Sequence, residues 1–211
     1  MAKRFARSAG SSPLPVQSSF KGRLTPVAAG VRASCIPAGL LLFLTSSPVF
    51  AGPEGGAVSA GQGSISTPDA NTTNVNQVSK NLVLDWQTFN LTEQEVVQFV
   101  QPSTKATALN RINDQNPSQI FGSIIANGNV ILLNPSGVFF SPTSHVDVHS
   151  LTASSLNIKN EDFMAGNYIY QAAPGQEGGP IINQGEIAAA TGGSVTLMGG
   201  AVSNEGLIVA H

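Results

Sequence analysis

Asn183-Gln184-Gly185-Glu186-Ile187 and Asn204-Glu205-Gly206-Leu207-Ile208 are two copies of one short pattern, and they begin 21 residues apart. Each copy places Asn and Gly, which tolerate the positive φ angles of tight corners, directly before an apolar stretch. A repeat of about 20 residues is the length of one solenoid coil. Ala126-Asn127-Gly128-Asn129-Val130 also precedes an apolar run and predicts an earlier corner of the same kind. Because one coil cannot bury its own apolar face, the pattern predicts coils that stack.

The segments between the corners alternate apolar and polar residues, which is typical of half-buried strands. The alternation is clear in three places: Leu82, Leu84 and Trp86; Val146 and Val148 between His145, Asp147 and His149; Val195 and Leu197 beside Ser194 and Thr196. The sequence therefore predicts an all-β fold. We expect Trp86, Phe89 and Phe99 to lie in its core, although large aromatic residues could also serve as surface contacts.

One segment is compatible with two kinds of secondary structure. Thr92-Glu93-Gln94-Glu95 matches a capping box at the start of a helix. The following residues, 96–100, contain three valines and a phenylalanine, and Pro102 closes the segment. Because β-branched residues lose rotamer freedom in helices, we favour a strand over residues 96–100.

The first 51 residues have the composition of a secretory signal. Six basic residues and no acidic residue precede or flank the apolar run 38–44. This run is too short to cross a bilayer, which requires about 20 residues. Val49-Phe50-Ala51 then provides the small residues that a signal peptidase accepts, which predicts cleavage after Ala51 and a new N-terminus at Gly52. We assign residues 1–51 to an extended Sec signal peptide.

Composition divides the remaining chain into two parts. Residues 52–73 are rich in small and polar residues and are expected to form a leader or linker. Residues 74–211 contain the strand pattern and form the predicted solenoid domain. The apolar stretch 207–210 is followed by no polar capping repeat, which predicts that the solenoid continues in a longer protein.

Charge and cysteine content argue against two classes of function. Residues 52–211 contain four Lys and Arg residues against twelve Asp and Glu residues, a formal charge of −8. Nucleic-acid binding requires clustered cations, so we expect no nucleic-acid partner. The one cysteine, Cys35, precedes Gly52, so a chain processed at Ala51 has neither a disulfide nor a cysteine metal site.

Several segments of residues 74–210 resemble a known family. Leu133-Asn134-Pro135-Ser136-Gly137-Val138 is similar to the family's NPNGI motif, with Ser136 and Val138 in place of Asn and Ile. Pro135 presets φ for a tight turn and Gly137 permits the next corner. Asn116-Pro117-Ser118-Gln119 is a partial candidate for its NPNL motif. The other similar segments are 85–91, 97–101, 109–112 and 120–124. The chain thus resembles the N-terminal two-partner secretion, or haemagglutination activity, domain of filamentous haemagglutinin-like and high-molecular-weight adhesin-like exoproteins.

This resemblance implies both a fold and a function. The implied fold is a right-handed parallel β-helix with an N-terminal β cap. The implied function is to signal secretion of a large exported adhesin or other exoprotein, and to template the folding of the coils that follow. The implied partners are the Sec machinery, signal peptidase and an outer-membrane barrel transporter with periplasmic recognition domains; downstream regions would contact any host or surface ligand. The product would be secreted or held at the surface of a Gram-negative-type bacterium, would not be an enzyme and would need no cofactor.

Other interpretations remain open at this point. His145, Asp147 and His149 share a strand face and could hold a metal ion, although an outward polar face is the simpler reading. A stand-alone secreted β-helix enzyme acting on polysaccharide would need clustered acidic or basic residues. Glu161 and Asp162 are adjacent and would face opposite sides of a strand, and Arg111 is the one arginine after Gly52. A truncated reading frame without function is the third alternative.

Overall fold

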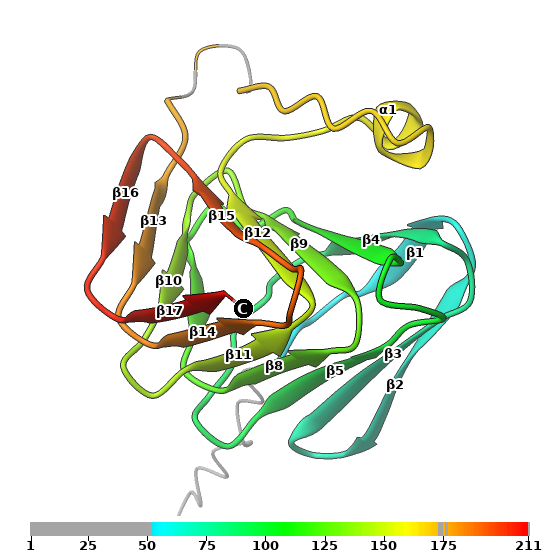
Figure 1. Cartoon of the computed structure of the whole chain (residues 1–211), viewed down its shortest axis with the longest axis horizontal. Coiled ribbons are helices and arrows are strands. Elements are labelled where there is room, and N and C mark those ends of the chain that lie inside the picture. The colour runs from blue at the N-terminus through cyan, green and yellow to red at the C-terminus, as the bar shows by residue number, and fades with distance from the viewer. Residues whose placement is uncertain (1–51, 173–174, 176, 211) are drawn as a thin grey trace, which may run out of the picture. The chain divides into compact units, whose positions relative to one another are not determined.

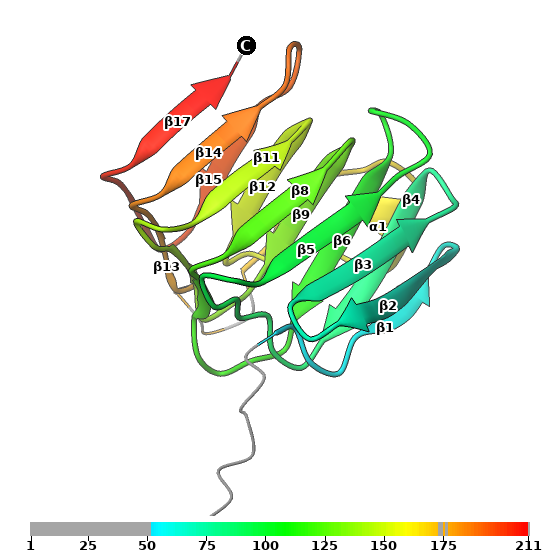
Figure 2. The same cartoon turned by 90° about the horizontal axis from the view of Figure 1, so that it is seen from below.

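The structure, a computed structural model, describes residues 52–172, 175 and 177–210. Ala51 and the rest of the expected signal peptide lie outside the described residues. Within them, seventeen strands form three sheets that run along a common stack (Figures 1 and 2). These residues also contain one short helix. Among these residues, the helix is too short and too polar to cross a membrane.

The three sheets have six, seven and four strands. The six-stranded sheet contains, in spatial order, β1 (Ala57–Ala60), β4 (Asn81–Trp86), β6 (Thr107–Ile112), β9 (Asn129–Leu133), β12 (Ser150–Ser154) and β15 (Val195–Met198). The seven-stranded sheet contains β17 (Leu207–Ala210), β14 (Glu186–Ala189), β11 (His145–Val148), β8 (Ser123–Ala126), β5 (Val96–Val100), β3 (Thr72–Gln77) and β2 (Gly63–Asp69). The four-stranded sheet contains β16 (Ala201–Asn204), β13 (Pro180–Asn183), β10 (Val138–Phe140) and β7 (Ser118–Ile120).

Each complete coil takes one strand from each sheet in turn, and neighbouring coils pair in parallel. β10, β11 and β12 form one coil, and β13, β14 and β15 form the next. The stack has about six turns, which confirms the predicted parallel β-helix. The repeat that predicted the coils is in register, because Asn183 pairs with Asn204 and Ile187 pairs with Ile208.

The earlier corner at residues 126–130 is not equivalent to these two, and this part of the sequence interpretation was wrong. It joins the seven-stranded sheet to the six-stranded sheet, whereas Asn183-Gln184-Gly185 joins the four-stranded sheet to the seven-stranded sheet. Because Glu186 lies in register with His145 and His145 with Ser123, the equivalent of Gly185 two coils earlier is Gly122. Asn and Gly suit every corner of a coil, so their presence does not distinguish one corner from another.

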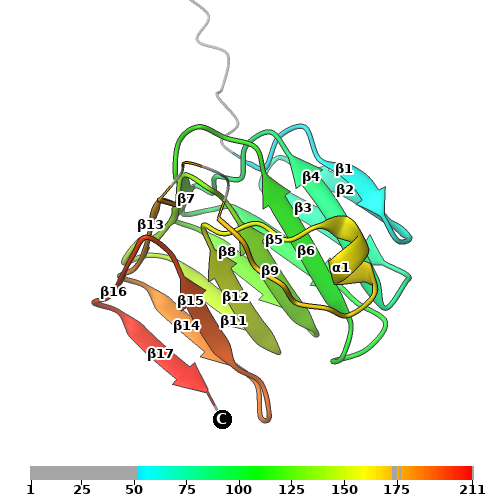
Figure 3. The same ribbon diagram turned by 90° about the horizontal axis from the view of Figure 1, so that it is seen from above.

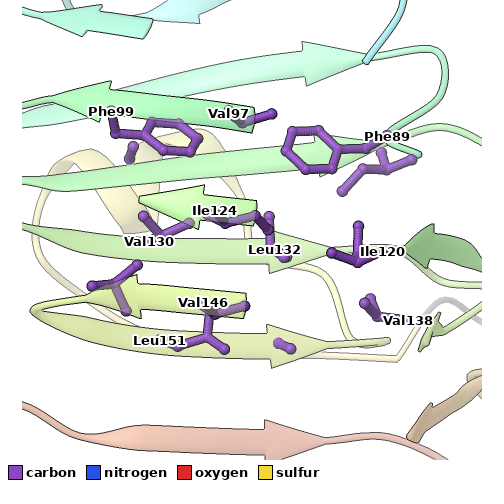
Figure 4. Close-up of a cluster of buried hydrophobic side chains, with 14 of the residues drawn as sticks. Phe89, Val97, Phe99, Ile120, Ile124, Val130, Leu132, Val138, Val146 and Leu151 are labelled. Atoms are coloured by element: carbon purple, nitrogen blue, oxygen red, sulfur yellow. The ribbon is translucent and has the colours of Figure 1, made fainter. Parts of the chain in front are cut away.

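The apolar side chains that were expected to face inward form the core between the sheets (Figure 4). Trp86, Phe89 and Phe99 are each at most 1% exposed, which confirms their predicted place in the core. The rings of Trp86 and Phe89 pack edge to face, with their centroids 5.5 Å apart. Residues 96–100 form strand β5, as we favoured; the Thr92 to Glu95 segment closes a turn before it, in which the Glu95 amide donates to the Thr92 carbonyl.

Residues 52–73, expected to be a leader or linker, instead form most of the cap over the first coil. β1 pairs with β4 and β2 pairs with β3, both antiparallel. The exposed side chains of β1 and β2 bury little, so composition alone gave no sign of strands. β1 and β2 are held in place by their backbone hydrogen bonds to β4 and β3 of the first coil. β2 is an edge strand, and Pro68 lies in it where a missing N–H is tolerated.

Residues 155–172 leave the coil and lie across the outer face of the six-stranded sheet (Figure 3). They contain helix α1 (Asn160–Met164) and bring Ile158 and Phe163 onto the sheet. A second apolar cluster results, whose other buried members are Val83, Leu109, Ile131 and Leu133. We call residues 155–172 the excursion. The sequence analysis did not predict it.

Candidate functional site: the Asn134 turn

Residues 134–138 join β9 of the six-stranded sheet to β10 of the four-stranded sheet. The side-chain oxygen of Asn134 accepts a hydrogen bond from the Ser136 amide at 2.9 Å, and the Asn134 carbonyl accepts one from the Gly137 amide at 2.9 Å. Gly137 has φ +109°, a conformation that L side chains rarely adopt. The sequence Asn-Pro-Ser-Gly is therefore matched to this corner in its side chains and in its backbone.

The turn is fixed to the preceding coil by side-chain hydrogen bonds. The side-chain nitrogen of Asn134 donates to the backbone carbonyl of Asn116 at 3.1 Å and to the Ser118 hydroxyl at 3.0 Å. The Ser136 hydroxyl donates to the Asp114 carbonyl at 3.0 Å. The Asn134 turn thus lies directly against the Asn116-Pro117 segment. Whether that segment corresponds to the second family motif stays a prediction.

The next coil covers the other side of the turn. The backbone amide of Gly179 donates to the Pro135 carbonyl at 2.7 Å. The backbone amide of Asn134 donates to the Ser154 carbonyl at 3.0 Å. A Cβ atom at Gly137 would lie 2.3 Å from the Pro180 carbonyl oxygen, so only glycine fits between these coils. The turn therefore connects three successive coils through its own atoms.

Burial limits what this turn can contact from outside. Asn134, Gly137 and Val138 are buried, whereas Pro135 and Ser136 are half-buried. Val138 packs in register between Ser118 and Ile181 of the adjacent coils. Asn134 has no exposed surface to offer to a partner. The geometry therefore suits an element that fixes the coils in register, with only Pro135 and Ser136 accessible to a second protein.

The candidate metal ligands on β11 do not converge. His145 and Asp147 face outward as their alternation predicted, while His149 lies at the bend after the strand. The His145 Nδ1 atom lies 3.4 Å from a carboxylate oxygen of Glu186 on the adjacent strand. No group of three His, Cys, Asp or Glu residues suited to a metal ion is found in residues 52–172, 175 and 177–210.

The contacts of three charged residues, Arg111, Glu161 and Asp162, involve the excursion. Arg111 forms an ion pair with Asp85 at 3.1 Å and donates to the Ile158 carbonyl at 2.7 Å, which ties the excursion to the sheet. Glu161 and Asp162 lie in the first turn of α1, where acidic residues interact favourably with the helix dipole. They lie on a helix and not on the strand that the sequence analysis considered.

Buried polar side chains that link coils were missed by the sequence analysis. Asn110 accepts a hydrogen bond from the Trp86 indole at 3.0 Å, and Asn183 donates to the Asn204 side chain at 2.7 Å. Both Asn110 and Asn183 are fully buried. Asparagine at an inward position of an alternating strand is the signal that could have identified them, because a buried amide requires partners.

Comparisons with known proteins agree with this architecture. The family described as the TPS secretion domain matches residues 51–211. A heme/hemopexin-binding protein of Haemophilus influenzae is 32% identical over 162 residues, which cover 74% of this chain and 18% of that protein. A second Haemophilus influenzae protein of that name is 33% identical over 94 residues, covering 44% of this chain and 10% of that protein. This chain thus spans less than a fifth of the length of these relatives.

A solved structure shows the same fold. The crystal structure of the HMW1 secretion domain from Haemophilus influenzae superposes with a TM-score of 0.71 at 32% sequence identity. The superposition covers 75% of this chain and 42% of that chain. The family match spans residues 51–211, which include the Asn134 turn, and this chain belongs to the TPS secretion domain family.

Proposed function

We propose that this chain is the N-terminal module through which a larger exoprotein is secreted, and that an outer-membrane barrel transporter recognises it through periplasmic domains. The observation that carries the proposal is the family match from residue 51 to residue 211, which covers the cap and every coil. The relatives are much longer than this chain, which supports a downstream passenger. The formal charge of −8 for residues 52–211 disfavours nucleic acid as the partner.

The proposed route has three steps. Residues 1–51 direct the chain through the inner membrane by the Sec machinery, and signal peptidase cleaves after Ala51. The transporter then delivers the module, followed by its passenger, to the surface or the medium of a Gram-negative bacterium. There the module templates β-helix folding, because β15, β16 and β17 each end a sheet and present backbone N–H and C=O groups to a following coil.

Within this function, the Asn134 turn fixes the register of the folding coils. Its buried side-chain hydrogen bonds support this role over direct recognition, because the transporter could touch only Pro135 and Ser136. The passenger would carry any adhesive or ligand-binding activity; heme and hemopexin binding is a property named for the relatives. The comparisons support the secretion function and not the alternative of a stand-alone polysaccharide-active enzyme, and Arg111 is engaged by Asp85 and the excursion.

Two measurements in the native organism test the proposal. An antibody raised against residues 52–211 is used to blot periplasm, outer membrane and culture medium. We expect a product far larger than the 21.7 kDa of this chain at the surface or in the medium. A small soluble species in the periplasm would contradict the proposal and favour a stand-alone protein or a truncated reading frame.

The double variant Asn134→Ala/Pro135→Ala tests the turn. We expect it to reach the periplasm and to fail to reach the surface. The control is Pro142→Ala, which removes an exposed proline from the turn that follows β10 in the same coil. Normal surface delivery of the Asn134 variant, or an equal loss in both variants, would contradict a special role for this turn.

A further inference from the structure

Glu95 is a buried carboxylate at the junction between the cap and the first coils. It is 5% exposed and lies immediately before strand β5. Its Oε2 atom accepts a hydrogen bond from the Thr92 amide at 2.6 Å. Among the described residues, Arg111 forms an ion pair with Asp85 and His145 lies beside Glu186, so Glu95 has no cationic partner there. A buried carboxylate is costly unless a positive group or several donors compensate it.

The second oxygen of Glu95 lies close to Gly52. A Cβ atom added to Gly52 would lie 3.3 Å from the Glu95 Oε1 atom, which places the Gly52 backbone against the carboxylate. Gly52, Glu54, Leu91, Glu95 and Val96 also line a common cavity of about 290 Å³. Among the described residues, Oε1 accepts no hydrogen bond. The open oxygen of Glu95 and the first described residue of the chain therefore share one site.

The segment that follows Gly52 is held in the cap and cannot move freely away from this site. The Glu54 amide donates to the Thr88 carbonyl at 3.0 Å, and the Gln87 amide donates to the Glu54 carbonyl at 2.9 Å. Glu54 thus forms an antiparallel bridge with Thr88. Two residues separate this bridge from the bond at which we expect signal cleavage, so the geometry of the cap positions Gly52 itself.

We propose that Glu95 is the binding site for the α-ammonium group that signal cleavage creates at Gly52. Before cleavage, the Gly52 nitrogen is a neutral amide with one N–H. Hydrolysis of the bond between Ala51 and Gly52 consumes one water, leaves the new carboxylate on Ala51 and leaves an ammonium group with three donors on Gly52. This ammonium group supplies a positive charge and further donors beside the Glu95 carboxylate, whose Oε1 atom accepts no hydrogen bond among the described residues. Removal of the signal peptide therefore tightens the cap.

The proposal rests on cleavage after Ala51, which the proposed function also includes, and it is independent of the transporter. The first test is the mass of the processed chain. The full chain is expressed with its signal peptide in a Gram-negative host, and the processed product is purified from the periplasm. We expect an intact mass and an N-terminal sequence that begin at Gly52. Any other N-terminus would overturn this proposal and the cleavage step after Ala51, and would leave the proposed recognition by the transporter unaffected.

The second test removes the charge from each partner in turn. Selective acetylation of the α-amine near pH 6.5 converts the ammonium group to a neutral amide, which imitates the uncleaved state, while lysines stay protonated. In the wild-type chain, we expect acetylation to lower Tm by about 4 °C, since a chain of this size shifts by a few degrees per lost ion pair. In Glu95→Gln, which keeps an acceptor for the Thr92 amide, acetylation should leave Tm unchanged.

Glu54→Gln is the matched control, because Glu54 is an exposed acid that lines the same cavity. We expect acetylation to lower the Tm of Glu54→Gln as it lowers that of the wild type. An acetylation effect of equal size in Glu95→Gln and the wild type would overturn the proposal, as would no effect in either. Surface delivery in the native organism tests the proposed function separately, so failure of one proposal is distinguishable from failure of the other.

Discussion

Asn134 uses every polar atom of its side chain inside the protein. Its oxygen accepts from the Ser136 amide, and its nitrogen donates to the Asn116 carbonyl and the Ser118 hydroxyl. The residue is fully buried, so water cannot replace these partners. Aspartate at this position would lose both donors, and alanine would lose all three bonds. An amide is therefore the one side chain of this size that satisfies the corner.

We predict that Asn134→Ala lowers the free energy of unfolding by about 3 kcal/mol, because three buried hydrogen bonds are lost and the partner groups stay unsatisfied. Urea unfolding of the processed chain measures this change. Asn116→Ala is the control, since the Asn116 side chain is exposed and the change should stay within about 0.5 kcal/mol. Equal losses of unfolding free energy in the two variants would show that the buried hydrogen bonds of Asn134 do not stabilise the fold.

Alanine substitutions at two glycines distinguish the cost of backbone strain from the cost of a steric clash. Gly137 and Gly166 both have positive φ, at +109° and +82°. A Cβ atom at Gly137 would lie 2.3 Å from the Pro180 carbonyl oxygen, whereas a Cβ atom at Gly166 would meet nothing within 4 Å. We predict that Gly166→Ala costs about 1 kcal/mol from strain alone, and that Gly137→Ala costs about 3 kcal/mol or more.

Thermal and urea unfolding of the two alanine variants measures this difference. A loss in Gly137→Ala that is no greater than in Gly166→Ala would mean that the coils separate enough at Pro180 to accept a side chain. The tight turn could be predicted from Pro135 and Gly137 themselves. The contact of Gly137 with Pro180 could not, because Pro180 lies 43 residues further along the chain and is adjacent only because the coils stack.

At the scale of elements, the excursion depends on a few contacts with the six-stranded sheet. Arg111 binds the Ile158 carbonyl, and Phe163 and Ile158 pack on the outer face of β4, β6 and β9. Tyr170 is also partly buried against this cluster. Burial raises the pKa of Tyr170 above its ordinary value, and the hydroxyl of Thr152 partly offsets this change.

Because the pKa of Tyr170 is raised, the excursion loses stability at alkaline pH. The neutral phenol is favoured in the folded state, so its contribution is fully present below the unfolded pKa of about 10 and is lost as pH rises through the higher folded pKa. We predict that Tm falls as pH rises above about 10 and that Tyr170→Phe reduces this fall. An unchanged pH dependence in Tyr170→Phe would contradict the assignment.

Strands of the coils could be predicted from sequence because their alternation reflects burial directly. Leu82, Leu84 and Trp86 face inward as their spacing requires. The cap could not be predicted, since β1 and β2 depend on backbone pairing that their small side chains do not reveal. The excursion left a weak signal: residues 130–133 are continuously apolar, and a strand that is apolar on both faces must be covered on both.

At the scale of the whole molecule, the strands of the coils form a one-dimensional stack in which each strand pairs only with those of neighbouring coils, while the excursion reaches back to β4. Val146, Ile187 and Ile208 occupy one position of the coil in three successive turns. Ile187 is fully buried between the other two, whereas Ile208 lies in β17, the last strand of its sheet, and is only partly buried. The same side chain therefore has two different environments that differ mainly in the number of neighbouring coils.

We predict that Ile187→Ala lowers the free energy of unfolding by about 3 kcal/mol, because it opens a cavity between two coils that cannot collapse onto it. Ile208→Ala should cost less than about half of this amount, since the 211-residue chain places a coil on only one side of it. Urea unfolding monitored by Trp86 fluorescence compares the two variants. Equal losses would show that β17 is as well packed as β14. A larger loss at Ile208 would show that the terminal coil governs the stability of the stack, which the templating role of this edge would not predict.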